Sequence, residues 1–420
     1  MSADGLVNAH LATPRGWGAA HMQTLRSRLL PPSAPTDGIA TSRTLRIAMN
    51  DGTPDALGVA LHTPRRYFDS RHSVSLVVLI HGLGGSSESA YILSTAGHLL
   101  RAGTAVARLD LRGAGRAGQP SQQMYHAGRT SDVRRVLEAL LDEPEARAPH
   151  GTQGLGIVGF SLGGNVTLKL LGEGVDGLPV RAAAAVSAPL DLAAGSEYLH
   201  HVAFGLYERA MVRGLRADVA RFAGEMSDRE RAAIAAARRI EEFDDAFTAR
   251  QNGWRDAAEY YAVNSSAQYL PHIRVPTLVM HALDDPVVPS GPYRAIDWEG
   301  LEAGGFVRRT ITAHGGHVGF HQRGNRPPFY VERVVRFLTG TGNYTDDINV
   351  NGQAYVHFLR SDVAHGKING ISTDVAAAMP GVVRIFTGAD FEGVGGIPCG
   401  WQVTDRHGNP MQEPAHPVLA

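Results

Sequence analysis

Short runs of apolar and β-branched residues alternate with segments of helical period along most of the chain. Runs that stay apolar at every position are typical of strands buried on both faces of a sheet. The alternation therefore predicts a mostly parallel sheet with helices on both faces. The expected buried strands are 76–80, 105–109, 155–160, 182–186, 277–281 and 307–312.

The first strands have a different pattern. Two apolar runs, 44–48 and 56–62, flank the turn residues Asn50-Asp51-Gly52, and this arrangement predicts an antiparallel pair. The helical segments that follow fit between the buried strands. The expected helices are 88–101, 130–141, 161–171 and 329–338.

The segment 197–261 breaks the alternation because it is charged, rich in Arg and Ala, and helical in period. An insertion of this kind above a sheet is typical of a cap over a pocket. A solvated helical excursion is the alternative interpretation.

The pattern changes again after residue 338. A turn cluster (339–343) precedes an alternating run (354–360), a short helical run (374–379) and a second expected strand (382–387), and 393–420 is rich in Gly and Pro. We therefore expect a domain boundary near Thr339, with one domain at 1–338 and a small α+β fragment at 339–420.

Composition narrows the protein class. The 420 residues are 43% hydrophobic and 19% charged, which excludes wholesale disorder. The 40 basic and 41 acidic residues give a net charge of -1, which argues against nucleic-acid binding. The single cysteine, Cys399, cannot form an internal disulfide. No apolar run reaches the roughly 18 residues of a membrane span, and residues 1–15 lack the apolar core of a secretory signal. We expect a soluble, cytoplasmic protein.

The strongest chemical signal is Ser161, which stands in the G-x-S-x-G sequence of residues 159–163. The motif follows the expected strand 155–160 and opens a helix, which is the context of a nucleophile elbow. Small neighbours are needed there because the serine occupies a strained strand-to-helix turn. The alternative is an ordinary serine N-cap.

A serine hydroxyl needs a general base, and the expected order along the chain is serine, acid, histidine. Asp284 and Asp285 follow the strand 277–281, and Asp285 stands directly before a Pro-Val-Val-Pro turn. We choose Asp285 as the acid, with Asp284 as the rival. His317 lies on a glycine-rich loop after the last strand, and we choose it as the general base.

An oxyanion formed by attack on a carbonyl requires backbone N–H donors. One should come from Leu162, the residue after the nucleophile, and the other from Leu83 in the Gly-rich loop after the strand 76–80. We expect His81 to brace that loop rather than transfer protons.

Two alternative cofactor interpretations are weaker. His314, His317 and His321 could suggest a zinc site, but the glycines between them interrupt any shared helical face. Residues 113–118 and 154–159 match G-x-G-x-x-G, yet neither lies between a strand and the start of a helix. We expect neither a metal nor an organic cofactor.

With these residues in place, 1–338 resembles the YheT-like branch of the α/β-hydrolase superfamily, whose members are carboxylesterase-type hydrolases. The resemblance implies an eight-stranded, mostly parallel sheet with flanking helices and a helical cap at about 197–261. In the N-terminal segment, Ala19-Ala20 departs from the family's Gly-His-x-Gln-Thr pattern. The similar segments are 18–24 (GAAHMQT), 110–113 (DLRG), 125–132 (YHAGRTSD), 161–165 (SLGGN), 284–286 (DDP) and 315–320 (GGHVGF).

The last segment resembles an unrelated protein. Its sequences GNYTDDI (342–348), FLRS (358–361) and PGVV (380–383) are similar to the beginning of the molybdenum-binding large subunit of aerobic carbon monoxide dehydrogenases. That subunit normally continues for hundreds of residues, and those residues hold the cofactor. We therefore expect no redox activity from 339–420.

These observations favour a serine esterase acting on a small-molecule ester with an apolar acyl group. Acyl transfer by the same triad remains open, as does a non-catalytic binding protein on a hydrolase fold. Only the segment 339–420, which we call the tail, supports the interpretation as a molybdenum hydroxylase subunit. The natural ester, the acyl length, the role of the tail and the oligomeric state cannot be read from the sequence.

Overall fold

The computed structural model describes residues 6–14, 16, 18–30, 38–65, 74–114, 120–146, 154–324, 326–340 and 367–391. The chain divides into two compact units, Met1–Gly342 and Asn343–Ala420. We describe each unit by itself, beginning with the first, which we call the body.

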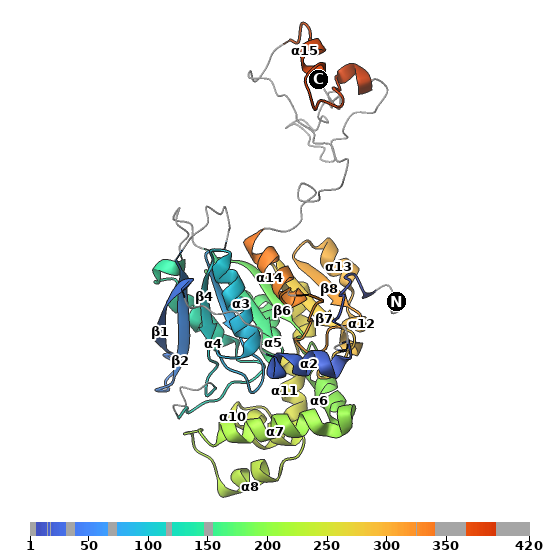
Figure 1. Ribbon diagram of the computed structural model, residues 1–420. Helices are drawn as coiled ribbons and strands as arrows, with labels where there is room; N and C mark the ends of the chain where they lie inside the picture. Colours follow the sequence, from blue (N-terminus) through green and yellow to red (C-terminus); the bar gives the residue numbers. More distant parts are fainter. Residues whose placement is uncertain are drawn as a thin grey trace, which may run out of the picture. The chain divides into compact units, whose positions relative to one another are not determined.

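An eight-stranded sheet runs through the body, with the strand order β1-β2-β4-β3-β5-β6-β7-β8 (Figure 1). β2 pairs antiparallel with both β1 and β4, and all other neighbours are parallel. The predicted α/β-hydrolase sheet is confirmed. Its strands are β1 (Ala40–Ala48), β2 (Ala56–Pro64), β3 (Leu76–Ile80), β4 (Ala105–Leu109), β5 (Leu155–Phe160), β6 (Val180–Val186), β7 (Thr277–Ala282) and β8 (Val307–Thr312).

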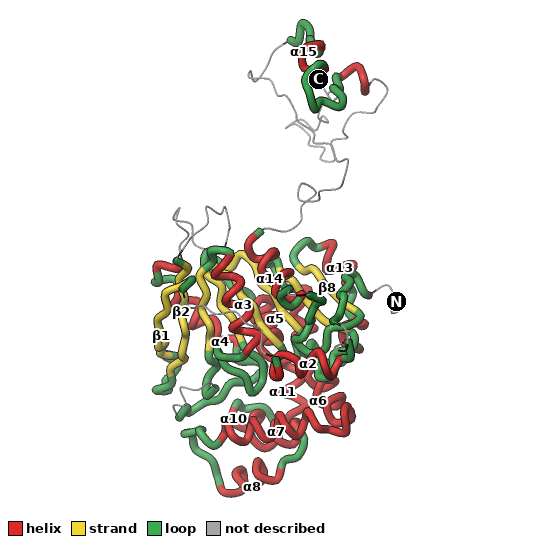
Figure 2. Tube along the Cα trace, in the orientation of Figure 1, coloured by secondary structure: helices red, strands yellow, loops and turns green. Residues whose placement is uncertain are grey.

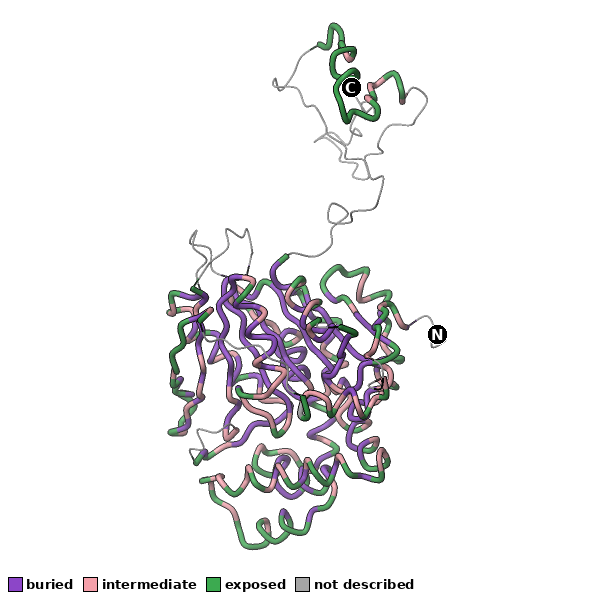
Figure 3. Tube along the Cα trace, viewed as in Figure 1, coloured by how far each residue is buried: buried purple, intermediate pink, exposed green. Residues whose placement is uncertain are grey.

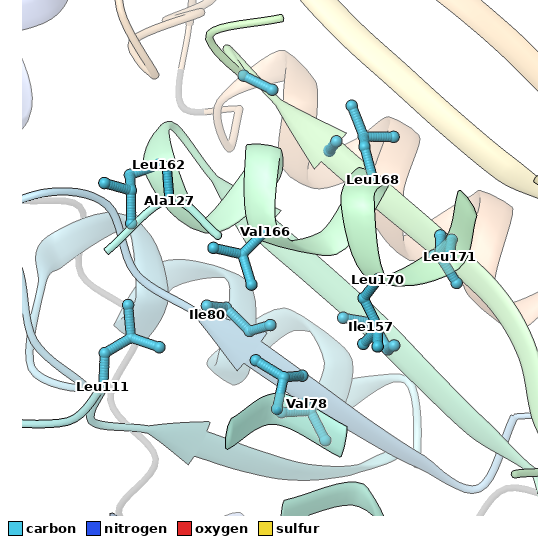
Figure 4. Close-up of a cluster of buried hydrophobic side chains, with 14 of the residues drawn as sticks. Val78, Ile80, Leu111, Ala127, Ile157, Leu162, Val166, Leu168, Leu170 and Leu171 are labelled. Carbon is cyan, nitrogen blue, oxygen red and sulfur yellow. The ribbon is translucent and has the colours of Figure 1, made fainter. Parts of the chain in front are cut away.

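Helices cover both faces of the sheet because the central strands carry apolar side chains on both faces. Val78 and Ile80 of β3 pack in one core cluster with residues of α4 and α5 (Figure 4), whereas Val77 and Leu79 pack in a second cluster with α3 and α14. The alternation follows from successive strand side chains pointing to opposite faces. The helices are α3 (Ala90–Arg101), α4 (Thr130–Leu140), α5 (Leu162–Glu173) and α14 (Phe329–Thr339), close to the predicted bounds.

The segment between β6 and β7 forms a group of helices at one end of the body, which we call the cap (Figure 2). It begins at Leu192, five residues before the predicted start at 197. None of the described helices is long and apolar enough to cross a membrane. The cap helices are α6 (Leu192–His201), α7 (Leu206–Val219), α8 (Asp228–Ala236), α9 (Ile240–Phe243), α10 (Ala249–Gln251) and α11 (Ala257–Asn264).

In the second unit, the structure describes 367–391, and none of these residues is buried. The predicted helical run forms the single turn α15 (Asp374–Ala377). The predicted strand at 382–387 is wrong: this stretch is irregular, and Val383 is 83% exposed. A strand is stabilised by a paired neighbour, which its β-branched residues alone do not supply. The predicted strand 354–360 and the loop 393–420 lie outside the described residues.

Candidate active site

Ser161 occupies the sharp turn between β5 and α5, with φ 52° and ψ −121°. Positive φ is uncommon for a residue with a side chain, and it aims the serine away from the strand. The neighbouring glycines are required sterically: a Cβ on Gly159 would lie 2.1 Å from the Gly163 carbonyl oxygen, and one on Gly163 would lie 2.5 Å from the His81 carbonyl oxygen. The elbow predicted from the sequence is therefore present in its geometry.

The structure brings His317 and Asp285 to this serine. His317 Nε2 lies 3.0 Å from Ser161 Oγ, and His317 Nδ1 lies 2.8 Å from Asp285 Oδ2. Asp285 comes three residues after β7, and His317 comes five residues after β8. Since these strands are parallel neighbours, their carboxyl ends lie on the same edge of the sheet. The three side chains form one hydrogen-bonded chain.

Asp285 is buried and held by its own turn. Its Oδ1 accepts hydrogen bonds from the backbone N–H groups of Val287 and Val288, at 2.8 and 2.9 Å. Burial raises the pKa of Asp285, but the interactions with His317, with His281 and with the Val288 N–H together outweigh burial and leave the pKa below its ordinary value. The carboxylate therefore stays ionised and can favour a positive charge on His317.

The rival residues lie nearby but have other partners. Asp284 Oδ1 accepts the N–H of Gly316 at 2.9 Å, and its Oδ2 lies 3.2 Å from His314 Nδ1. The ring of His321 faces Ser27 Oγ at 3.1 Å. The three candidate zinc ligands do not converge, and the described residues contain no group of three or more ligand side chains suited to a metal ion.

A second histidine lies behind the acid. His281 of β7 is completely buried, and its Nδ1 is 4.0 Å from Asp285 Oδ2. Its ring stacks on Tyr293 with a centroid separation of 3.9 Å. Burial lowers the pKa of His281 to about 4, so the ring is neutral at pH 7. No motif in the sequence marks His281 as part of the site, and its position at the end of a buried strand is the available signal.

The loop that carries His317 is supported by α2 (Ala20–Leu29), near the other end of the body's sequence. Thr24 Oγ1 accepts the N–H of His317 at 2.9 Å, and Gln23 Oε1 accepts the N–H of His321 at 2.7 Å. A Cβ on Gly316 would lie 2.5 Å from the Ala20 carbonyl oxygen, so the two segments approach very closely. Gln23 and Thr24 belong to the motif 18–24, but their role in supporting this loop was not predicted from the sequence.

The two predicted oxyanion donors flank Ser161. In the loop after β3, Gly82 donates its N–H to Tyr91 Oη at 3.0 Å, and Gly84 donates its N–H to Tyr125 Oη at 2.9 Å. Within the described part of the chain, the N–H groups of Leu83 and Leu162 donate no hydrogen bond. Both residues line the same cavity as Ser161. His81 braces the loop: its Nδ1 lies 2.7 Å from the Gly82 carbonyl oxygen, and its Nε2 accepts the N–H of Leu111 at 3.1 Å.

A mainly apolar cavity opens at Ser161. It lies between the cap and the carboxyl ends of the strands, which we call the sheet edge. The sheet-edge side contributes Val287 and Val288. The cap contributes most of the apolar side chains, namely Leu192, Leu199, Met211, Leu215, Ile240, Phe243 and Phe247.

Two carboxyl groups interrupt this lining. Asp218 accepts a hydrogen bond from Tyr125 Oη at 3.1 Å. Asp244 accepts hydrogen bonds from Thr248 Oγ1 at 2.6 Å and from Tyr261 Oη at 2.8 Å. Burial raises the pKa of Asp244 to about 6.

Comparison with known proteins finds two matching families and a relative of most of the chain. Residues 75–323 match the family described as alpha/beta hydrolase fold, and residues 339–412 match the a/b hammerhead domain of aldehyde oxidase and xanthine dehydrogenase. A protein of Escherichia coli named putative esterase YheT is 33% identical over 324 residues, which cover 74% of this chain and 87% of that protein.

Two further relatives match different parts of the chain. The monoacylglycerol lipase of Saccharomyces cerevisiae is 26% identical over 66% of this chain and 61% of its own length, so the chain spans about three fifths of that relative. The nicotine 6-hydroxylase large subunit of Paenarthrobacter nicotinovorans is 53% identical over 58 residues, which are 14% of this chain and 7% of that subunit.

Proposed function

The chain belongs to the alpha/beta hydrolase fold family, and on this premise we propose that it is a carboxylic ester hydrolase whose nucleophile is Ser161. The observation that carries the proposal is the hydrogen-bonded chain from Ser161 Oγ through His317 to Asp285, with distances of 3.0 and 2.8 Å. Leu83 and Leu162 line the same cavity as Ser161, and among the described residues their backbone N–H groups donate no hydrogen bond.

In the first half-reaction, Ser161 Oγ attacks the ester carbonyl carbon while His317 Nε2 takes the hydroxyl proton. The carbonyl oxygen becomes an oxyanion, which the N–H groups of Leu83 and Leu162 stabilise. The tetrahedral intermediate then expels the alcohol, which receives the proton from His317. This leaves an acyl-enzyme on Ser161.

In the second half-reaction, water attacks the acyl-enzyme and gives a proton to His317 Nε2. The second tetrahedral intermediate then collapses: the bond to Ser161 Oγ breaks, Oγ takes the proton back from His317 Nε2, and the acid product departs. Asp285 stays ionised throughout. It holds the Nδ1–H of His317 and stabilises the imidazolium in each half-reaction. The residues need no metal and no organic cofactor for these steps.

The cap cavity suggests the substrate class. Its lining favours an ester with an apolar acyl group, and the E. coli and yeast relatives bear the names of an esterase and a lipase. Burial of the apolar surface of an acyl chain in this cavity makes binding more favourable by about 25 cal/mol per Å².

The second unit adds no step to this mechanism. A molybdenum cofactor would need an enclosed site, and the described residues 367–391 are all exposed or half-exposed. The residues described there do not fit such a cofactor, and we derive no redox chemistry from them.

A fluorophosphonate probe tests the proposal because it reacts with activated serines. The folded protein should be labelled at Ser161 and hydrolyse a soluble ester, and Ser161→Ala should lose both properties. Ser196→Ala removes another hydroxyl that lines the same cavity and should keep the label. A folded protein that is not labelled would instead be a binding protein on a hydrolase fold.

A further inference from the structure

The turn between α6 and α7 holds an aromatic side chain in solvent. Ala203, Phe204 and Gly205 have consecutive positive φ angles of 46°, 55° and 70°. This conformation is costly for residues with a side chain. Phe204 is 91% exposed and Leu206 is 60% exposed. The body therefore presents two adjacent large apolar side chains that contribute nothing to its core.

Three arginines lie next to these apolar side chains. Leu206, Arg209 and Arg213 are three and seven residues apart on α7, so they share one face of the helix. Phe204, Arg209, Arg213 and Arg238 line one surface depression of about 520 Å³. Figure 3 shows that the outer parts of α7 and α8 are largely exposed.

Within the described part of the chain, none of these three arginines forms an ion pair through its side chain. Arg209 donates to the neutral carbonyl of Phe204 at 2.8 Å.

Four acidic groups lie around the depression, and one of them, Glu242, accepts the backbone N–H of Arg238 at 2.7 Å. The other three have partners outside the arginines named above. Glu208 is buried and accepts the N–H of Ile240 at 3.0 Å. Glu197 and Glu241 lie 2.9 and 3.6 Å from Arg239. The depression therefore presents a net positive charge beside an exposed apolar pair.

We propose that this surface, formed by Phe204, Leu206, Arg209, Arg213 and Arg238, docks the protein on an anionic lipid bilayer. Phe204 and Leu206 would enter the interface between headgroups and acyl chains, while the arginines would contact the headgroup phosphates and carboxylates. A bilayer fits this combination because it offers negative charge above an apolar layer. A soluble anion would account for the arginines alone.

The position of this surface gives docking a consequence. α7 carries Leu206, Arg209 and Arg213 on its exposed side, whereas Met211 and Leu215 of α7 and Leu199 of α6 line the cavity at Ser161. A protein docked in this way holds its apolar cavity close to the lipid phase. Docking itself requires no catalysis, so it can be tested separately from the proposed hydrolysis.

Co-sedimentation with vesicles tests the proposal on the full chain. The protein should bind vesicles of phosphatidylcholine mixed with phosphatidylserine, bind pure phosphatidylcholine weakly, and lose binding at high salt. Phe204→Ser and the double variant Arg213→Ala/Arg238→Ala should each weaken binding by roughly tenfold. Turnover of a soluble ester should stay unchanged in all of them.

The matched control is Phe306→Ser/Arg308→Ala, which removes an exposed phenylalanine and an exposed arginine at the start of β8. These residues lie at the end of the sheet opposite the triad, and the control should bind vesicles normally. Absence of binding to anionic vesicles would overturn the proposal. So would normal binding by Phe204→Ser with loss in the arginine variant, because that result describes an anion site without insertion. Equal loss in the control would also contradict it.

Discussion

The sheet edge and the cap both face the cavity, but they are built differently. β5 and β7 are buried at every position, and the elbow leaves no room for a Cβ on Gly159, which would lie 2.1 Å from the Gly163 carbonyl oxygen. In the cap, α8 has a single buried residue, Ile234, and α7 buries three of its fourteen residues. Dense packing fixes the positions of the reacting atoms. In the cap, most side chains are not buried, so substitutions there should cost little stability. We therefore expect changes at the edge to affect chemistry and changes in the cap to affect selectivity.

The sharpest contrast within the edge is between two histidines of one loop. His317→Ala should lower kcat on the order of a million-fold, because serine loses its base and the triad acts as a unit. His314, whose side chain is 61% exposed and contacts Asp284, should tolerate alanine with most activity kept. Steady-state kinetics on a soluble ester measures both. If His314→Ala were the more damaging change, the base would be misassigned.

The paired aspartates give the next largest effect. Asp285→Asn should reduce kcat by about 10⁴-fold, since an amide neither stabilises the imidazolium nor fixes its tautomer. Asp284→Asn should cost only a few-fold, because its carboxylate orients the Gly316 N–H and touches His314 rather than His317. Kinetics of both variants at several pH values decide the matter, and equal losses would move the acid to Asp284.

A cap variant tests the other side of the comparison. Leu215→Trp adds volume to a buried position of the cavity and should shift kcat/KM toward short acyl chains by about tenfold, with activity on the shortest ester retained. Ala210→Trp, on the exposed face of the same helix, is the control and should leave the preference unchanged. An unchanged preference in Leu215→Trp would mean that the acyl chain lies elsewhere.

Asp244 offers a smaller, purely energetic effect. Its pKa is about 6 in the folded protein against an ordinary 3.8, so between these values the folded state keeps a proton that the unfolded state has lost. The free energy of unfolding should therefore fall as pH rises from about 4 to about 6, by about 2–3 kcal/mol from this group. Asp244→Asn should remove that fall in denaturant titrations, whereas Asp245→Asn, at an exposed neighbour, should retain it. Parallel pH curves for wild type and Asp244→Asn would contradict the assignment.

The smallest expected effect concerns the second unit. α14 ends at Thr339, and Gly340 follows it in the left-handed conformation that terminates helices. Every residue of the proposed mechanism precedes this point. A chain ending at Gly340 should keep full ester hydrolysis and an unchanged melting temperature. Loss of activity on removing 341–420 would show that those residues complete the site.

Much of the fold and part of the site could be predicted from local sequence. The elbow at Ser161 was predictable because strand, turn and helix lie within a few residues, and strands such as β3 and β4 were bounded to the residue. The choice between Asp284 and Asp285 stayed open because adjacent residues of a turn point in different directions, which composition does not record. The contacts of Thr24 and Gln23 with the His317 loop join segments 293 and 298 residues apart, beyond any periodicity. The prediction of a strand at 382–387 was wrong because the β-branched residues of this stretch have no neighbouring strand to pair with among the described residues.

The contact between α2 and the His317 loop has a consequence for biosynthesis. Residues 20–24 leave the ribosome first, yet their partners at 316–321 follow almost three hundred residues later. Asn8 is also synthesised long before its partner: its Oδ1 accepts the N–H of Ile311 in β8 at 2.7 Å. A nascent chain can pair β3, β4 and β5 well before this closure occurs. Its histidine loop gains support only after synthesis has passed residue 321, so we expect the growing polypeptide to be inactive until α2 meets the loop 316–321.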